Sequence, residues 1–371
     1  MSNTHTTTQW VKFNLHNIVK FRVNASAATA PLFEDMFRPF LTDEDIQHFD
    51  LTISGELEPL QDGAFGEAHG ETEFHYNAEG VHLDALEVQV FRTPEGGFRL
   101  NGNRELLVMA LPLIDRLMVQ KNAAMVHALT VEYKGHALLM PAWGGTGKTS
   151  TMSKLVEMEG FAFMGDDWAF VTKDANLLAY PKPMFIKPYH RSLYPHLFNK
   201  VRKPLVPVKL SKSIHSVTTL VHPYITKYPR LASMTRRWSP EHMMVAPQVA
   251  FPHARFSTAA PIAAALFVER FDSASTDPVF VEKDSRWMTS QLVGNFFSEL
   301  PRQSRVVMTT LGASALSPID QAFIEKSAVL NTALQGKCCF YLRVPQALSP
   351  DQASDMIVSH IQKVLEMAGV K

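Results

Sequence analysis

The chain has 371 residues, enough for one large domain or two ordinary ones, and 46% of them are hydrophobic, so a substantial buried core is expected. No apolar run approaches the ~20 residues of a membrane-spanning helix. The polar, Thr-rich first nine residues lack the basic and apolar regions of a signal peptide. The two cysteines, Cys338 and Cys339, are adjacent, which favours neither a disulfide framework nor a metal site. These features predict a cytoplasmic enzyme without a membrane partner.

The net charge of zero hides an uneven distribution along the chain. Residues 1–105 hold 17 Asp or Glu and 7 Lys or Arg, whereas residues 175–240 hold 12 Lys or Arg and no acidic residue. Exposed surfaces usually mix both signs. The acid-free stretch therefore predicts contact with ATP phosphates, an acidic substrate or the acidic N-terminal region. Nucleic acid is disfavoured, because no recognition helix or RNP-type motif accompanies the positive charge.

The first hundred residues predict strands. Short alternating apolar segments recur between residues 10 and 100 and indicate a β-rich N-terminal domain at 1–105, which we assign to substrate or partner recognition. A helix is predicted from about Arg104 to Gln120, because apolar residues repeat there at helical spacing. Pro112 is expected to kink this helix.

The rest of the chain predicts an α/β (α+β-like) catalytic domain at 106–371, with a basic insertion at about 175–257. A strand is expected at Cys339–Val344 near its end. A helix follows from about Pro350 to Met367, with Ser349 as its N-cap.

Residues 142–149 read Ala-Trp-Gly-Gly-Thr-Gly-Lys-Thr, the pattern of a phosphate-binding loop with Ala142 in place of the usual first Gly. An apolar run precedes the loop and a helical pattern follows it, which is the context the motif requires. Glycines let backbone N–H groups turn toward phosphate oxygens, and the helix N-terminus adds its positive dipole end. The candidate nucleotide-binding residues are Gly144, Gly145, Thr146, Gly147, Lys148, Thr149 and Ser150.

Two adjacent acids, Asp166 and Asp167, lie between two apolar segments about twenty residues after the loop. Adjacent carboxylates at a strand end are costly unless they meet a cation or a proton donor. Beside a phosphate loop that cation is Mg²⁺, which one acid holds with the Thr149 hydroxyl while the other accepts the proton of an attacking hydroxyl. The competing interpretation is a solvated turn. Lys182 and Lys187 are further cations that could reach a phosphate, although a surface position is the commoner outcome for a lysine. Arg270 follows an apolar run and either points into the site or pairs with Glu269 or Asp272.

Residues 123–133 predict one apolar strand, which turns at Lys134-Gly135 into the strand that feeds the loop. His127 lies within this strand. A lone His in apolar surroundings is usually a satisfied core residue. Only its position relative to the phosphate-loop motif and the acid pair makes His127 a candidate site residue.

Taken together, three segments resemble the C-terminal catalytic domain of HPr kinase/phosphorylase, which shares its nucleotide site with ATP-type phosphoenolpyruvate carboxykinases. They are Val126-His127-Ala128, Gly144–Thr149 and Gly165-Asp166-Asp167. The family has Gly, Ser and Ala where this chain has Ala128, Thr149 and Gly165. The resemblance is specific over 123–172 and implies a divergent kinase that phosphorylates serine in a peptide or a small molecule. It also implies that His127 lies near the transferring phosphoryl group.

These patterns favour an ATP- and Mg²⁺-dependent kinase acting on a hydroxyl of a peptide, a protein or a small molecule. The candidate catalytic residues are Asp167, Asp166, His127 and Lys148, and the candidate metal ligands are Thr149 and Asp166. At this point it stays open which acid is the base and whether the chain forms a homo-oligomer. Two alternatives remain: an ATP-binding regulatory module without turnover, and a carboxykinase-like enzyme. The acid pair favours catalysis, because a binding module would not need both carboxylates.

Overall fold

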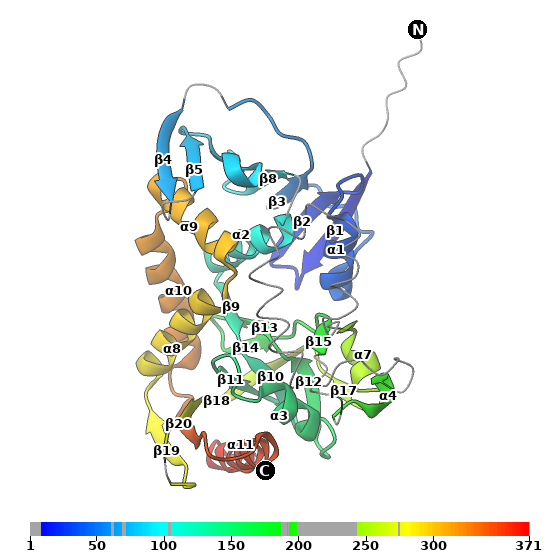
Figure 1. Cartoon of the computed structure of the whole chain (residues 1–371), viewed down its shortest axis with the longest axis vertical. Helices are drawn as coiled ribbons and strands as arrows, with labels where there is room; N and C mark the ends of the chain where they lie inside the picture. The colour runs from blue at the N-terminus through cyan, green and yellow to red at the C-terminus, as the bar shows by residue number, and fades with distance from the viewer. Residues whose placement is uncertain are drawn as a thin grey trace, which may run out of the picture. The chain divides into compact units, whose positions relative to one another are not determined.

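The computed structural model describes residues 9–60, 63–68, 72–102, 105–186, 191, 193–198, 243–273 and 275–370. The chain forms two compact units: Met1–Lys182 together with Arg255–Lys371, and Pro183–Ala254. Large β-sheets and helices build the first unit, so the expected mixed α/β class is confirmed (Figure 1). Within the described part of the chain, no helix has the length and apolar character needed to cross a bilayer.

An eight-stranded sheet occupies the N-terminal region, in the order β1-β2-β3-β8-β7-β6-β5-β4. Several of its strands alternate buried and partly buried side chains, as in β2, where Val19, Phe21 and Val23 are buried. Helix α1 (Ala30–Met36) lies between the second and third strands. The strands are β1 (Trp10–Leu15), β2 (Val19–Asn24), β3 (Leu51–Ser54), β4 (Ala64–Ala68), β5 (Thr72–Tyr76), β6 (Gly80–Leu83), β7 (Val88–Arg92) and β8 (Phe98–Gly102).

The expected boundary near residue 105 does not separate two independently packed domains. One hydrophobic core contains Phe13 and Leu100 of the N-terminal sheet, Met109 of α2 (Leu106–Gln120), and Phe170 and Val307 from later in the chain. The predicted helix is therefore present, with Pro112 inside it, and it packs on both sides of the expected boundary. The β-rich region is real, but it shares its core with the rest of the first unit.

A ten-stranded sheet follows, with the path β17-β12-β10-β11-β18-β14-β13-β9 and with β20 joining β18 to β19. The 13-residue strand β18 runs parallel to both β11 and β20 and so ties the sheet together. The strands are β9 (Ala123–His127), β10 (Leu129–Tyr133), β11 (His136–Met140), β12 (Phe161–Gly165), β13 (Trp168–Thr172), β14 (Asn176–Leu178), β17 (Arg255–Phe256), β18 (Ala259–Phe271), β19 (Val279–Lys283) and β20 (Cys338–Pro345).

Helices pack on this sheet and on one another. Helix α8 contacts β9, β18 and β20, and α11 contacts α3, β18 and β20. The predicted start of the last helix is confirmed, since Ser349 and Gln352 form a capping box. The helices are α3 (Lys148–Leu155), α8 (Ser285–Glu299), α9 (Arg302–Ala313), α10 (Ile319–Leu334) and α11 (Pro350–Met367).

The single strand expected at 123–133 is wrong, because the chain forms two strands that break at Ala128. Strand β9 pairs with β13, whereas β10 pairs with β11 and β12. The N–H of Ala128 at the break donates to the backbone carbonyl of Asp167, at 2.9 Å. This hydrogen bond joins the His-bearing strand directly to the acid pair.

The second unit, Pro183–Ala254, lies inside the insertion expected at 175–257. It contains a two-stranded sheet of β15 (Met184–Ile186) and β16 (Met243–Val245) and the short helices α4 (Pro195–Phe198) and α7 (Pro247–Ala250). Strand β14 belongs to the main sheet instead, so the insertion starts later than predicted. Most of the basic stretch, at 187–190, 192 and 199–242, lies outside the described residues.

A buried ion pair braces the strand that carries His127. Lys326 of α10 is 2% exposed, and its Nζ lies 2.6 Å from Asp115 Oδ1 and 2.6 Å from the carbonyl of Met125 in β9. The same Nζ sits 3.4 Å from the centre of the Phe296 ring of α8. Burial lowers the pKa of Lys326, and the charge of Asp115 opposes that shift. One ammonium group thus connects α2, α8, α10 and β9.

Lys326→Ala is expected to lower the free energy of unfolding by roughly 3–5 kcal/mol, because it leaves the buried Asp115 carboxylate uncompensated. Lys154→Ala is the matched control. Lys154 pairs at 2.6 Å with Asp355, whose side chain is 69% exposed, and losing such a pair costs about 0–1 kcal/mol. Urea unfolding followed by circular dichroism measures both. Equal losses for the two variants would contradict the bracing role of Lys326.

Candidate active site

The phosphate-loop motif lies between β11 and α3, as the sequence predicts. Gly145 has φ +79° and Gly147 has φ +101°, in the left-handed region where residues with a Cβ are strained. A Cβ at either position would meet no heavy atom within 4 Å, so backbone conformation rather than space calls for glycine. Gly147 is the N-cap of α3, and Ser150 lies in the first turn of that helix.

The side chains of the loop fold back onto its own carbonyl groups. Lys148 Nζ donates to the Ala142 carbonyl at 2.7 Å, and the Thr146 hydroxyl donates to the Trp143 carbonyl. Burial lowers the pKa of Lys148, while the charges of Asp167, Glu299 and Asp166 raise it. The ammonium group is therefore a cation held among carboxylates at the start of α3.

Asp166 contacts the loop through Thr149, whose hydroxyl donates to Asp166 Oδ2 at 3.1 Å. The other oxygen, Oδ1, is buried and has no hydrogen-bond partner among the described residues. Burial, and then the charge of Asp167, raises the pKa of Asp166 from 3.8 to about 7. The charges of Lys182 and Lys148 lower this pKa but do not outweigh burial and the charge of Asp167.

Thr149 and Asp166 fit Mg²⁺. Magnesium prefers oxygen ligands and keeps several waters or phosphate oxygens, so it needs only one or two protein groups. An unpartnered buried carboxylate oxygen beside a hydroxyl at a phosphate loop meets that requirement. Across the described ranges, no group of three or more His, Cys, Asp or Glu side chains could hold a metal ion. Zinc sites are usually built from such groups, whereas a magnesium site of the kind described above needs only one or two protein ligands.

Asp167 has both carboxylate oxygens occupied. His127 Nε2 lies 2.5 Å from Oδ1, and Lys182 Nζ lies 2.7 Å from Oδ2. Burial raises the pKa of this carboxyl, but the charge of Lys182 and the hydrogen bond from His127 outweigh burial and hold the pKa well below its usual range. Asp166 and Asp167 are neighbours in sequence, yet their environments push their pKa values in opposite directions.

His127 is buried, as expected for a core histidine, but it is fully engaged in polar contacts. It is the last residue of β9, and its cross-strand partner on β13 is Trp168, the residue after Asp167. The Trp168 ring packs edge-on against the imidazole at 5.0 Å. The remaining ring nitrogen, Nδ1, lies 3.0 Å from the Asn295 side-chain oxygen of α8. Strand pairing therefore explains how His127 reaches the acid pair.

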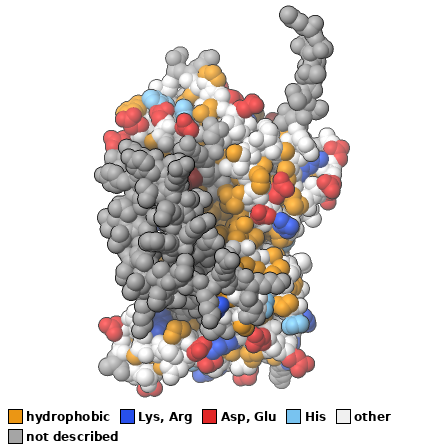
Figure 2. Space-filling view, turned by 45° about the vertical axis from the view of Figure 1, so that its right-hand side comes forward, with side chains coloured by type: hydrophobic (Ala, Val, Ile, Leu, Met, Phe, Trp, Pro, Cys, Tyr) orange, Lys and Arg blue, Asp and Glu red, His pale blue; other side chains and the backbone are white. Residues whose placement is uncertain are grey.

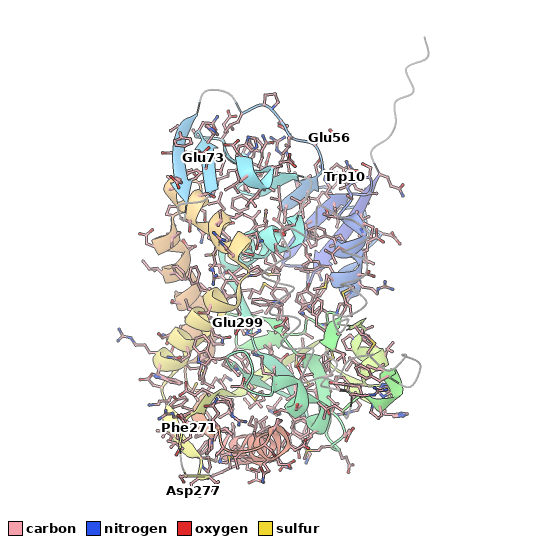
Figure 3. The ribbon with its side chains drawn as sticks, viewed as in Figure 1. Trp10, Glu56, Glu73, Phe271, Asp277 and Glu299 are labelled. Carbon is pink, nitrogen blue, oxygen red and sulfur yellow. The ribbon has the colours of Figure 1, made fainter. Side chains whose placement is uncertain are left out.

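Helix α8 completes the site, and the sequence analysis missed it. Asn295 Nδ2 donates to the Ala142 carbonyl at 3.2 Å, and Glu299 Oε1 accepts from the Gly144 N–H at 3.0 Å. Glu299, labelled in Figure 3, is the last residue of α8 and lies one helical turn beyond Asn295. The one available signal was a polar residue, Asn295, directly before a core residue, Phe296, and that pattern is too common to predict a site.

The other candidate cations have different outcomes. Lys182 reaches Asp167, while Lys187 lies outside the described residues. Arg270 donates to the carbonyls of Gln346 and Leu348, at 3.2 and 2.8 Å, in the loop after β20. It is thus engaged away from the acid pair.

On the face in Figure 2, Asp and Glu side chains are interspersed with Lys and Arg.

Comparison with the models of known protein families and with curated proteins gave no match to this chain. A function therefore has to be argued from the geometry of this site and from the motif resemblance.

Asp166→Asn should stabilise the magnesium-free protein more at pH 8 than at pH 5. Between 3.8 and about 7 the folded state keeps a proton on Asp166 that the unfolded chain releases, so wild-type stability falls as pH rises through that window. Asparagine does not titrate. Thermal melts in EDTA, compared with Asp355→Asn at an exposed site, measure the difference. A gain that is the same at both pH values would show that the raised pKa is wrong.

Proposed function

We propose that this chain is an ATP- and Mg²⁺-dependent kinase that transfers the γ-phosphoryl group to a hydroxyl of a peptide, a protein or a small molecule. The observation that carries the proposal is the convergence of three segments on one site. Lys148 and Thr149 lie at the loop, Asp166 contacts Thr149, and Asp167 is held between His127 and Lys182. Phosphoryl transfer needs positioning and charge neutralisation more than covalent chemistry, and these groups supply both.

In this proposal the loop binds the triphosphate. The Gly144–Gly147 amides and the N-terminus of α3 face the phosphates, and Lys148 exchanges its contact with the Ala142 carbonyl for a phosphate oxygen. Glu299 must leave the Gly144 N–H for a phosphate to bind there. Thr149 and Asp166 are the Mg²⁺ ligands, and the bound ion would neutralise charge on the transferred group.

Asp167 is then the residue that orients the acceptor hydroxyl. Its lowered pKa makes it a weak base, but in a loose transition state the hydroxyl needs alignment more than early deprotonation. Each carboxylate oxygen has a second lone pair beyond the one used by His127 or Lys182, so Asp167 can accept a hydrogen bond from the acceptor. Lys182 and His127 hold the carboxylate in place for it.

The two alternatives are less well supported. A carboxykinase needs further metal ligands and an anion-binding arginine, neither of which the sequence identifies, and Arg270 binds backbone carbonyls. A regulatory module that only binds ATP does not account for an ionised Asp167 with two buried partners, each 6% exposed or less, because binding requires no oriented carboxylate beyond the metal ligand.

Lys148→Ala should weaken ATP–Mg²⁺ binding roughly 10- to 100-fold through loss of charge-assisted hydrogen bonds, and it should abolish transfer without unfolding the protein. Isothermal titration calorimetry measures the binding, and labelled ATP with a fractionated cell extract measures the transfer. Lys154→Ala removes a cation later on the same helix, one that pairs with Asp355, and should behave like wild type. ATP affinity and turnover at the wild-type level in a folded Lys148→Ala protein would remove the phosphate-loop assignment.

Substitution of the two acids should impair different steps of the reaction. Asp166→Asn is expected to raise the Mg²⁺ concentration needed for turnover, whereas Asp167→Asn should bind ATP–Mg²⁺ normally and lose kcat. Steady-state kinetics over a magnesium series separate these effects. If both variants turn over at the wild-type rate, neither acid takes part in the transfer and the kinase proposal loses its main support. If the wild type binds ATP but no extract fraction takes up label, the regulatory-module alternative replaces the kinase.

A further inference from the structure

Asn295 connects the two halves of the site through one side chain. It lies on α8 with 0% of its surface exposed. Its amide contacts the Ala142 carbonyl of the phosphate loop at 3.2 Å and His127 Nδ1 at 3.0 Å. A fully buried amide must satisfy its donors and its acceptor with protein groups, so the orientation of Asn295 is restricted by these two neighbours.

The carbonyl of Ala142 decides which way the amide points. A backbone carbonyl can only accept hydrogen bonds, so the Asn295 nitrogen must face Ala142 and the Asn295 oxygen must face His127. Ala142 also accepts from Lys148 Nζ at 2.7 Å, which uses its second lone pair. The amide orientation thus follows from its neighbours.

The amide in turn requires a proton on one ring nitrogen of His127. Because the Asn295 oxygen is an acceptor, the ring nitrogen facing it, Nδ1, must carry a hydrogen. The opposite placement would set a lone pair on Nδ1 against the amide oxygen at 3.0 Å. Flipping the amide to relieve that contact would point its oxygen at the Ala142 carbonyl. Both alternatives bring two acceptors together in a buried site, which is costly.

We propose that Asn295 is a positioning residue that keeps a proton on His127 Nδ1, so that the imidazole is held between two acceptors, with Nδ1–H donating to Asn295 and Nε2–H donating to the Asp167 carboxylate. This role rests on the proposed kinase function, because it acts by holding Asp167 where the acceptor hydroxyl binds. His127 Nε2 reaches Asp167 Oδ1 at 2.5 Å, while the Trp168 ring packs against the imidazole at 5.0 Å. Asn295 thus fixes the ring at one nitrogen, while the other carries a hydrogen because it faces the ionised carboxylate of Asp167.

The test is nitrogen-15 NMR of the full-length chain labelled at histidine, because the chemical shift of each ring nitrogen reports whether it is protonated. Comparison with His127→Gln identifies the His127 signals. In the wild type, Nδ1 should have the shift of a protonated nitrogen. In Asn295→Leu it should move to the unprotonated position, because Asp167 keeps a proton on Nε2. In Asn295→Asp it should stay protonated, because a carboxylate still accepts from Nδ1.

Thr289→Val is the matched control. Thr289 lies on the same helix, is buried, and its hydroxyl has no hydrogen-bond partner among the residues described, so the His127 spectrum should be unchanged. In the transfer assay, Asn295→Leu should lower kcat about 10- to 100-fold, as loss of an orienting partner typically does, with a smaller change in the KM for ATP. Asn295→Asp should recover part of that loss.

Retention of the Nδ1 proton in folded Asn295→Leu would overturn the proposal, as would loss of that proton in Thr289→Val. The NMR result does not depend on turnover. If the nitrogen shifts follow the expected pattern while no acceptor is ever phosphorylated by the wild type, the positioning of His127 by Asn295 stands and the kinase function falls.

Discussion

The site depends on the ionised carboxylate of Asp167. Its side chain is 35% exposed, and withdrawing a charge even partly from water is costly unless partners satisfy it. Here one oxygen faces His127 and the other faces Lys182, and both partners are buried. These partners come from separate parts of the chain: His127 ends β9, and Lys182 follows β14. The backbone of Asp167 also accepts from Ala128, where two strands of the main sheet separate.

The N-terminal sheet supports this arrangement. His16, in the turn between β1 and β2, lies with Nε2 2.8 Å from the Ala179 carbonyl. The next residue, Tyr180, stacks on Phe37 and on Phe170. Both contacts fall just before Lys182, so the segment that delivers this cation is held by a region that we expected to be a separate recognition domain. The ion pair of Asp115 with Lys326 does the same for the strand that carries His127.

Asp166 and Asp167 are chemically identical side chains whose pKa values differ because their surroundings differ. Asp167 has cationic and hydrogen-bonding partners and stays charged, while Asp166 has a hydroxyl and an unpartnered oxygen and has a pKa of about 7. Pairs of carboxyl groups whose environments shift them apart commonly divide catalytic roles. A bound cation would reverse the shift at Asp166, which is why we propose that residue as the metal ligand and its neighbour as the orienting group.

The sequence by itself determined the local parts of the site. The glycines, Lys148 and Thr149 are contiguous, and the strand–loop–helix pattern around them follows from hydrophobic periodicity and turn chemistry, which act over a few residues. The acid pair between two apolar strands was readable for the same reason. Only the tertiary structure decided that 123–133 breaks at Ala128, that Lys182 reaches Asp167, and that Asn295 and Glu299 belong to the site. These contacts join residues far apart in the chain through sheet order and helix packing, and no local pattern encodes which distant side chains a fold brings together.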